Sequence, residues 1–142
     1  MTPRQIELVR SSFARLAPMA AAAGALFYSR LFELDPALKA LFKHDLQEQS
    51  HKLMQMIGLA VALLDRPDML VHALDALGRR HSVYGVKPQD YKTVGDALIL
   101  TLGEGLGEAF TPELNDAWVA VYELISSTMQ RSAAAQSGHR LR

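Results

Sequence analysis

The sequence predicts a single all-α domain of six or seven helices. Apolar residues recur every three or four positions in most segments, which is the spacing of one helix face. No segment of useful length alternates apolar and polar residues, the pattern that is typical of strands. Prolines stand where helices are expected to begin. A chain of 142 residues fits one domain and can bury about two-thirds of its unfolded surface, enough for a core with an internal ligand pocket.

The first helix is expected to begin at Pro3. Thr2 and Gln5 have the spacing of a capping box, in which each side chain bonds to the backbone of the other residue, and Pro3 suits the first turn. The apolar stripe that follows consists of Ile6, Val9, Phe13 and Leu16. Because Pro18 interrupts this pattern, a second, alanine-rich helix is expected over about residues 19–34.

The middle of the chain predicts three further helices. Pro36 opens a short one that carries Leu38, Leu41 and Phe42. The segment Gln47–Leu64 is amphipathic, and one of its faces consists of Leu53, Met56, Ile57, Ala60, Val61 and Leu64. The run Asp65-Arg66-Pro67 ends this segment, and another helix is expected from Asp68 to about His81.

Two long helices complete the prediction. The first follows Pro88, and its apolar face consists of Tyr91, Val94, Leu98 and Leu102. Three glycines, Gly103, Gly105 and Gly107, are expected to end it. Thr111 and Pro112 cap the last helix, whose inward face consists of Trp118, Val121, Tyr122, Ile125 and Met129. Because periodicity is then lost, we expect a domain over residues 1–131 and a disordered tail over residues 132–142.

Composition excludes several classes of function. The 15 basic residues balance the 15 acidic ones and form no cationic block, which argues against nucleic acid or a membrane as a partner. The absence of cysteine excludes disulfides, thiolate metal sites and iron–sulfur clusters. The first residues are polar and lack the apolar core of a signal peptide, so a cytoplasmic protein, monomeric or weakly dimeric, is expected.

His81 is the first residue that points to a function. It follows Leu70, Leu74 and Leu77 at the end of their apolar helical stripe, so its side chain should face the core. A buried imidazole without a partner costs free energy, so it must meet a donor, an acceptor or a metal. The stripe alone leaves two interpretations open, a core histidine satisfied by a hydrogen bond and a ligand.

The other four histidines do not build a metal site with it. His44 and His51 flank a polar turn and are expected to be exposed, His72 lies on the face away from Leu74, and His139 is in the tail. None has the spacing that would place it beside His81, and no carboxylates accompany them, so a protein-only zinc site is not expected. The usual catalytic and phosphate-binding motifs are absent from the sequence as well.

Small residues predict a close crossing of two helices. Gly24 in the second helix and Ser50 in the long amphipathic one would let their backbones approach. The crossing would bring Tyr28, Gln49 and Leu53 together, with Phe42 closing the side and one imidazole opposite. The alternative is that Tyr28 and Phe42 are ordinary core residues and that Gln49 is solvated.

Several short segments in this order resemble the single-domain bacterial globins and are similar to the haem domain of flavohaemoglobins. They are residues 26–32, Pro36 with Leu41-Phe42, residues 49–53, residues 81–91, Val94-Gly95, and Ala117-Trp118 with Tyr122. The resemblance covers about residues 3–131. It implies a globin fold of six to eight helices that enclose a pocket for haem b, iron protoporphyrin IX.

The resemblance also implies roles for individual residues. His81 would be the proximal ligand of a five-coordinate iron, with its other ring nitrogen bonded to a backbone carbonyl one turn earlier. Tyr28 and Gln49 would act on the distal side as the functional pair. The remaining haem contacts would be Phe42, Lys52, Leu53, Val86 and Tyr91, of which Lys52 could pair with a haem propionate.

One position departs from the family pattern. Flavohaemoglobins carry a glutamate near the end of the last helix that strengthens the proximal ligand through the tyrosine at the position of Tyr91. Residues 131–135 contain no acid here, and Glu123 comes too early. This puts a peroxidase-like proximal relay in doubt, and any reductase is expected to be a separate protein.

Two functions follow from the resemblance. With Tyr28 as a hydrogen-bond donor, dioxygen should bind tightly and leave slowly, and nitric oxide and carbon monoxide should bind as well. The protein would then be a nitric oxide dioxygenase that depends on an external reductase, or a non-enzymatic protein for oxygen storage, transfer or sensing. A haem-free helical interaction module is a third, more remote hypothesis.

Overall fold

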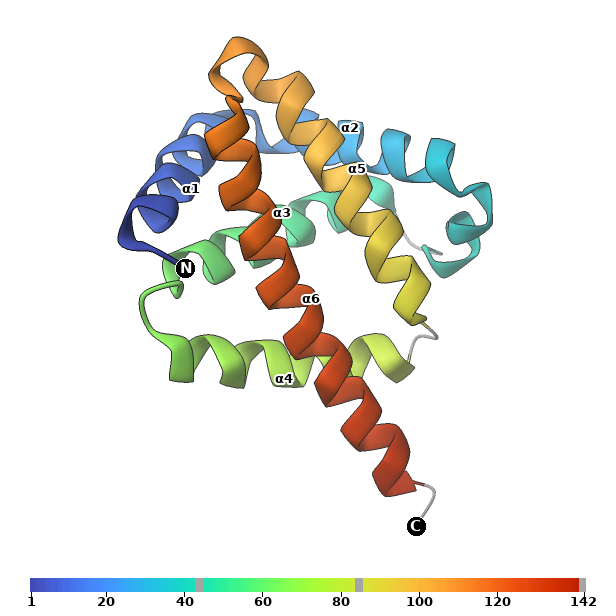
Figure 1. The fold of residues 1–142 in the computed structure, drawn as a ribbon. Helices are drawn as coiled ribbons and strands as arrows, with labels where there is room; N and C mark the ends of the chain where they lie inside the picture. The colour runs from blue at the N-terminus through green and yellow to red at the C-terminus, as the bar shows by residue number, and fades with distance from the viewer. Residues whose placement is uncertain (43–44, 84–85, 141–142) are drawn as a thin grey trace.

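The computed structural model describes residues 1–42, 45–83 and 86–140, without the side chains of 82–83, 133 and 135–140. Over these residues the chain forms six α-helices and no strand, which confirms the predicted all-α class (Figure 1). The helices are α1 (Pro3–Leu16), α2 (Ala20–Leu34), α3 (Leu46–Ala62), α4 (Pro67–Val83), α5 (Pro88–Leu106) and α6 (Pro112–Arg140). Three short 3-10 helices are η1 (Ala17–Met19), η2 (Pro36–Leu41) and η3 (Gly107–Ala109).

Local chemistry explains where the helices begin. The capping box at α1 is confirmed, because Thr2 Oγ1 accepts from the Gln5 N–H at 3.1 Å and Gln5 Oε1 accepts from the Thr2 N–H at 3.0 Å. Asp45 Oδ1 caps α3 by accepting from the Gln47 N–H at 3.0 Å. Thr111 Oγ1 caps α6 by accepting from the Leu114 N–H at 3.2 Å.

Two helices extend farther along the chain than the sequence predicts. Gly103 and Gly105 lie inside α5, and only Gly107, whose φ is 57°, stands at its end. Gly103 and Gly105 are tolerated inside the helix because glycine lowers helix stability without breaking it, whereas a positive φ ends it. Helix α6 likewise continues past residue 131 to Arg140, through alanines that favour helix even though the hydrophobic periodicity has stopped.

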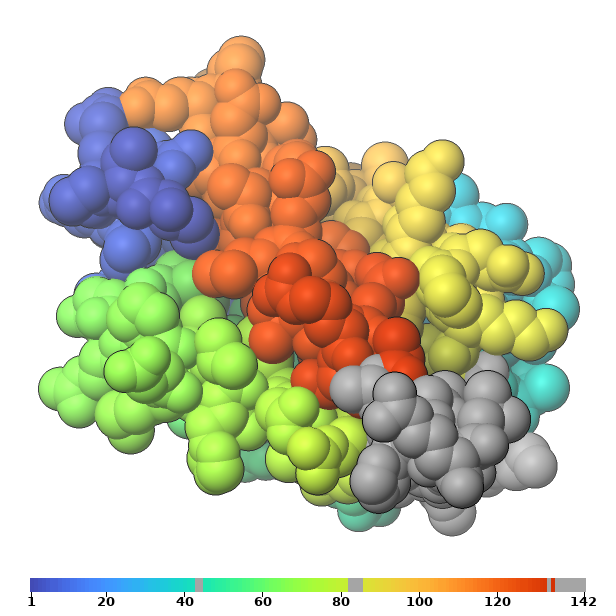
Figure 2. Space-filling model, turned by 60° about the horizontal axis from the view of Figure 1, so that its bottom comes forward, coloured from blue at the N-terminus to red at the C-terminus, as the bar shows by residue number. Residues whose placement is uncertain are grey.

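Close helix crossings organise the packing. A Cβ on Gly24 would lie 2.5 Å from Ser50 Cβ, so the predicted approach of α2 to α3 is confirmed. A Cβ on Gly78 would lie 2.5 Å from the Met129 carbonyl oxygen, which shows that α4 and α6 approach as closely. In the space-filling view α6 runs between α4 on one side and α5 on the other (Figure 2). Close crossings at glycine let backbones pack at the short end of the usual interhelix distance.

The buried apolar side chains form two clusters. The larger one joins α1, α3, α4, α5 and α6, and at its centre Trp118 Nε1 donates to Ser12 Oγ at 2.9 Å. The smaller one consists of Phe27, Tyr28, Leu31, Leu38 and Ala97, with Phe42 and Leu53 packed against it. Leu98 contacts both clusters. Within the described residues, no helix is both long enough and apolar enough to cross a bilayer.

Candidate functional site

The candidate site lies where α3 and α4 face each other. A short turn joins these two helices, yet over their described residues their backbones approach each other at few points. Figure 1 shows α3 above α4, with the two helices diverging from the turn toward the start of α5. The predicted apolar stripe on α4 is confirmed, since Leu70 and Leu74 are buried and Leu77 and His81 are partly buried.

His81 is held in one orientation by its own helix. Its Nδ1 lies 2.8 Å from the Leu77 carbonyl oxygen, one turn earlier, as expected. Because a carbonyl oxygen can only accept, Nδ1 carries the proton and the lone pair of the neutral ring is on Nε2. Burial lowers the pKa of His81, while the bond to Leu77 acts in the opposite direction. No described residue forms a hydrogen bond with Nε2, so the ring presents a free lone pair at neutral pH.

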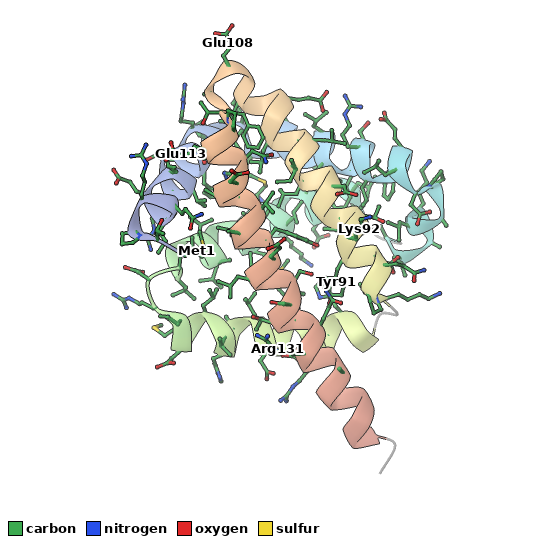
Figure 3. The ribbon with its side chains drawn as sticks, viewed as in Figure 1. Met1, Tyr91, Lys92, Glu108, Glu113 and Arg131 are labelled. Atoms are coloured by element: carbon green, nitrogen blue, oxygen red, sulfur yellow. The ribbon has the colours of Figure 1, made fainter. Side chains whose placement is uncertain are left out.

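Val86 and Tyr91 lie near the end of α4 that carries His81 (Figure 3). The Val86 N–H donates to the His81 carbonyl at 3.1 Å, which ties the start of the next segment to the end of α4. Figure 3 shows Tyr91 near the start of α5, close to where α4 and α6 cross. Its side chain is only 7% exposed, yet its hydroxyl has no hydrogen-bond partner among the described residues. A buried hydroxyl without a partner costs free energy, which points to a partner that is bound rather than built in.

The glutamate relay considered above has no counterpart among the described residues. Glu123 is exposed, and no described acid bonds to the Tyr91 hydroxyl. Helix α6 instead contacts the backbone of Tyr91. The Tyr122 hydroxyl donates to the Tyr91 backbone carbonyl. A Cβ on Gly95, one turn after Tyr91, would lie 2.6 Å from the Tyr122 ring. Gly95 and Tyr122 therefore fix the position of α5 against α6 without engaging the Tyr91 hydroxyl.

The predicted distal residues belong to an aromatic cluster. Tyr28 is 5% exposed and packs edge-to-face on Phe42 and on Phe27, with ring centroids 5.1 Å apart in both pairs. Leu53 joins the same cluster from α3. Burial raises the pKa of Tyr28 to about 12, so its hydroxyl is a proton donor throughout the physiological range. The structure thus brings together Tyr28, Phe42 and Leu53.

Gln49 and Lys52 are not part of the cluster that brings together Tyr28, Phe42 and Leu53. Gln49 is partly buried next to Ser50, and it makes no side-chain hydrogen bond with a described residue. Lys52 is exposed, and its ammonium lies 3.5 Å from Glu48 in an ion pair along α3. His51 and His72 are exposed as predicted, whereas His44 lies outside the described residues, as does the side chain of His139.

This arrangement suits a flat, mainly apolar group that carries a metal. The described part of the chain contains no cluster of three or more histidine or acidic side chains that could hold a metal ion by itself. What it offers is a single oriented imidazole lone pair, an unpartnered buried hydroxyl and apolar walls. Haem iron is held by a neutral imidazole lone pair and its ring by apolar surfaces, so the residues present fit the group.

Several neighbours of the site were not identified from the sequence. Phe27 and Phe32 extend the aromatic cluster, and Val94 and Leu98 of α5 pack against it. The Ser12–Trp118 hydrogen bond could have been found, because Ser12 interrupts the stripe of Val9 and Leu16 and a buried indole N–H needs an acceptor. The Tyr122–Tyr91 contact has no sequence pattern that would predict it.

Comparisons with known proteins identify the family. The globin family model matches residues 25–129. Neuroglobin of Tetraodon nigroviridis is 34% identical, over 94% of this chain and 93% of its own length. Neuroglobin of Danio rerio is also 34% identical, over 94% of this chain and 92% of its own.

A solved structure matches the whole chain as well. It is an engineered carbene transferase derived from a proposed nitric oxide dioxygenase of Rhodothermus marinus, with a TM-score of 0.89 and 25% identity. The match covers 100% of this chain and 99% of that one. It agrees with the expected likeness to single-domain bacterial globins. The chain belongs to the globin family, whose members bind haem and, through it, diatomic gases such as oxygen.

Proposed function

We propose that this globin holds haem b between α3 and α4 with His81 as the single protein ligand of a five-coordinate iron, and that it binds dioxygen with high affinity. The observation that carries the proposal is the state of His81: Nδ1 donates to the Leu77 carbonyl, and no described residue bonds to Nε2. When bound, haem supplies ferrous iron, which binds diatomic gases and allows dioxygen to oxidise nitric oxide. A cytoplasmic location and a monomeric or weakly dimeric state stay predictions.

The other residues would hold the ring. Phe42 and Leu53 would pack against it, which their partly buried positions allow. Val86 would contact it as well, and the Tyr91 hydroxyl, which has no described partner, would lie on the side of His81. Lys52 would pair with a propionate, in competition with its neighbour Glu48. Because that ion pair is exposed, the competition costs little.

Tyr28 and Gln49 would control release on the distal side. The Tyr28 hydroxyl stays protonated at neutral pH, and its burial removes competing water. A hydrogen bond to a charged acceptor contributes about 1.5–3 kcal/mol, or roughly ten- to hundredfold in affinity. The Gln49 amide can add a second donor. Most of this gain appears as slow dissociation of dioxygen.

The enzymatic hypothesis is the conversion of nitric oxide and dioxygen to nitrate, with a separate reductase returning the iron to the ferrous state. Its support is the likeness to the Rhodothermus marinus protein. Non-enzymatic oxygen storage, transfer or sensing is the second candidate. It is favoured by the Tyr91 hydroxyl, which has among the described residues no acidic partner that would strengthen the proximal ligand.

The visible spectra of the purified protein in its ferric, ferrous and carbon-monoxide forms test the site. We expect a five-coordinate ferrous spectrum that is lost in His81→Gly and restored by added imidazole, since free imidazole can occupy the vacated position. A variant that keeps the native spectrum without imidazole would exclude His81 as the ligand.

Turnover separates the two functions. With a flavin reductase and a nicotinamide donor, sustained consumption of nitric oxide and stoichiometric nitrate would support the dioxygenase. A single stoichiometric burst without re-reduction would instead support oxygen storage, transfer or sensing. Tyr28→Phe serves as a control, because faster loss of dioxygen should lower the yield of nitrate at a given nitric oxide concentration.

A further inference from the structure

The peptide group between Leu77 and Gly78 makes the contact that orients His81. Its carbonyl oxygen accepts from His81 Nδ1 at 2.8 Å, and this oxygen lies in one rigid plane with the Gly78 nitrogen. His81 follows Gly78 within about one turn of α4, so this turn supplies both the backbone of the imidazole and its hydrogen-bond acceptor. A displacement of this peptide group would therefore move the ring with it.

Gly78 lies directly against the backbone of α6, which crosses α4 (Figure 1). An added Cβ would lie 2.5 Å from the Met129 carbonyl oxygen and 2.8 Å from the Met129 Cα. Helical backbone atoms cannot turn aside as the end of a flexible side chain can, so the two helices would have to separate. Because Gly78 does not have a positive φ, the short distance between the helices is the reason for glycine at this position.

A hydrogen bond holds the same two helices together about one turn away. Ser132 Oγ, on the turn after Met129, donates to the Asp75 carboxylate at 2.7 Å, and Asp75 lies on the turn before Gly78. Asp75 Oδ2 also pairs with the Arg79 guanidinium at 3.0 Å, so both ends of the carboxylate are engaged. The contact of Gly78 with Met129 and the bond from Ser132 to Asp75 together form the α4–α6 junction.

Little else in the described structure holds the His81 ring. No described residue bonds to Nε2, and the Val86 N–H donates to the backbone carbonyl of His81 instead of its ring. Helix α3, which faces α4, approaches it at few points. Helix α6 is a firmer support, because the buried indole of Trp118 bonds it to Ser12 of α1 at 2.9 Å. The position of the ring therefore depends mainly on how α4 rests on α6.

We propose that Gly78 is a positioning residue for the iron ligand. The α4–α6 junction fixes the Leu77–Gly78 peptide group, and this peptide group fixes the place and tilt of the His81 ring. The proposal rests on the proposed function, since it requires that His81 holds the iron. A displaced ring would point its Nε2 lone pair away from the iron and bind it more weakly. The last helix, which supplies no atom to the imidazole, thus sets the strength of the bond that the imidazole makes.

The test is the iron–histidine stretching band in the resonance Raman spectrum of the ferrous protein without bound gas, which reports the strength of this one bond. Gly78→Ala should shift the band to lower wavenumber, because the added Cβ forces α4 away from α6. Gly24→Ala is the matched control, since its Cβ would also lie 2.5 Å from its neighbour but would separate α2 from α3. Both variants should lower the free energy of unfolding, and only Gly78→Ala should shift the band.

A second comparison removes the covalent link between the ligand and α4. In His81→Gly, added imidazole supplies the same nitrogen without a bond to the helix, so it can approach the iron wherever α4 lies. The iron–imidazole band should then be the same in His81→Gly and in the double variant that also carries Gly78→Ala. A shift that persists would place the effect in the shape of the pocket instead of in His81 and would overturn the proposal.

Ser132→Ala tests the junction without adding atoms to it. It removes the bond to Asp75 and should shift the band in the same direction as Gly78→Ala but by less, and it keeps the proposal testable if Gly78→Ala does not fold. An unchanged band in either variant in its folded state, or an equal shift in Gly24→Ala, would overturn the proposal. A native band that remains in His81→Gly without imidazole would instead contradict the proposed function, and this proposal with it.

Discussion

The two side chains proposed to act on either side of the haem have opposite proton requirements. His81 must be neutral to present a lone pair, and burial favours this by lowering its pKa. Tyr28 must keep its proton to donate a hydrogen bond, and burial favours this by raising its pKa to about 12. The same desolvation therefore prepares an acceptor on one side and a donor on the other, because burial disfavours whichever form is charged.

Replacing Tyr28 with Phe should accelerate dioxygen dissociation by about ten- to hundredfold, since it removes a hydrogen bond worth about 1.5–3 kcal/mol. Stopped-flow replacement of dioxygen by carbon monoxide measures the rate. Tyr122→Phe is the control, because that hydroxyl donates to the Tyr91 carbonyl and should not affect release directly. An unchanged rate in Tyr28→Phe would exclude Tyr28 as a donor.

The raised pKa of Tyr28 also predicts a dependence of stability on pH. An unfolded tyrosine loses its proton near pH 10, whereas the folded one keeps it to about 12. Between these values the folded state binds more protons than the unfolded state, so the free energy of unfolding falls as pH rises. Urea unfolding at about pH 8 and pH 11 measures this change. Between the two pH values, the free energy of unfolding should fall less in Tyr28→Phe than in the unaltered protein. Equal losses would mean that Tyr28 ionises normally.

At the scale of elements, the contact between α2 and α3 positions the distal side. Gly24 and Ser50 set the distance between these helices, and Tyr28 follows Gly24 by one turn. The ion pairs of Arg30 with Glu33 and Glu104 lie on the α5 side of α2, with side chains that are at least a quarter exposed. Such pairs contribute little to stability, so the position of Tyr28 depends on close packing, at Gly24 against α3 and at Ala97 of α5.

A methyl group at Gly24 should separate these helices. Gly24→Ala places a Cβ 2.5 Å from Ser50 Cβ, and overpacking of this kind costs about 1–3 kcal/mol. Gly103→Ala is the matched control, because its Cβ would meet only the Phe110 ring at 3.6 Å and should stabilise α5 by about 0.5–1 kcal/mol. Chemical denaturation measures both. Equal stability of Gly24→Ala and the unaltered protein would contradict the close crossing.

At the scale of the whole molecule, α6 contacts three other helices, α1, α5 and α4. The Arg4–Glu113 ion pair ties its start to α1, and its middle packs on α5 through Tyr122. Farther along, the Ser132 hydroxyl donates to the Asp75 carboxylate at 2.7 Å and so bonds α6 to α4, the helix that carries His81. This contact involves the first residue after the predicted boundary at 131.

Shortening the chain tests where the domain ends. Because hydrophobic periodicity stops before Ser132, ending the chain after Ser132 should change the free energy of unfolding by no more than about 0.5 kcal/mol. Ser132→Ala should cost about 1 kcal/mol, since the buried hydroxyl bonds to a carboxylate. Thermal and urea unfolding measure both changes. A large loss on truncation would place part of the core after residue 132.

The sequence by itself determined the features that depend on neighbours along the chain. Capping residues, prolines and apolar spacing predicted the helix starts, and the stripe through Leu74 and Leu77 predicted that His81 faces inward. The same periodicity allowed the Gly24–Ser50 crossing to be inferred, because small residues on two inward faces leave few other arrangements.

Only the tertiary structure decided which groups meet. It showed that Tyr122 bonds the backbone of Tyr91 and leaves its hydroxyl without a described partner, and that Gly78 lies against the α6 backbone at Met129. It also showed that Gly107 alone ends α5. These contacts depend on crossing angles and distances between helices, which are set by the packing of the whole core and leave no periodic trace in the chain.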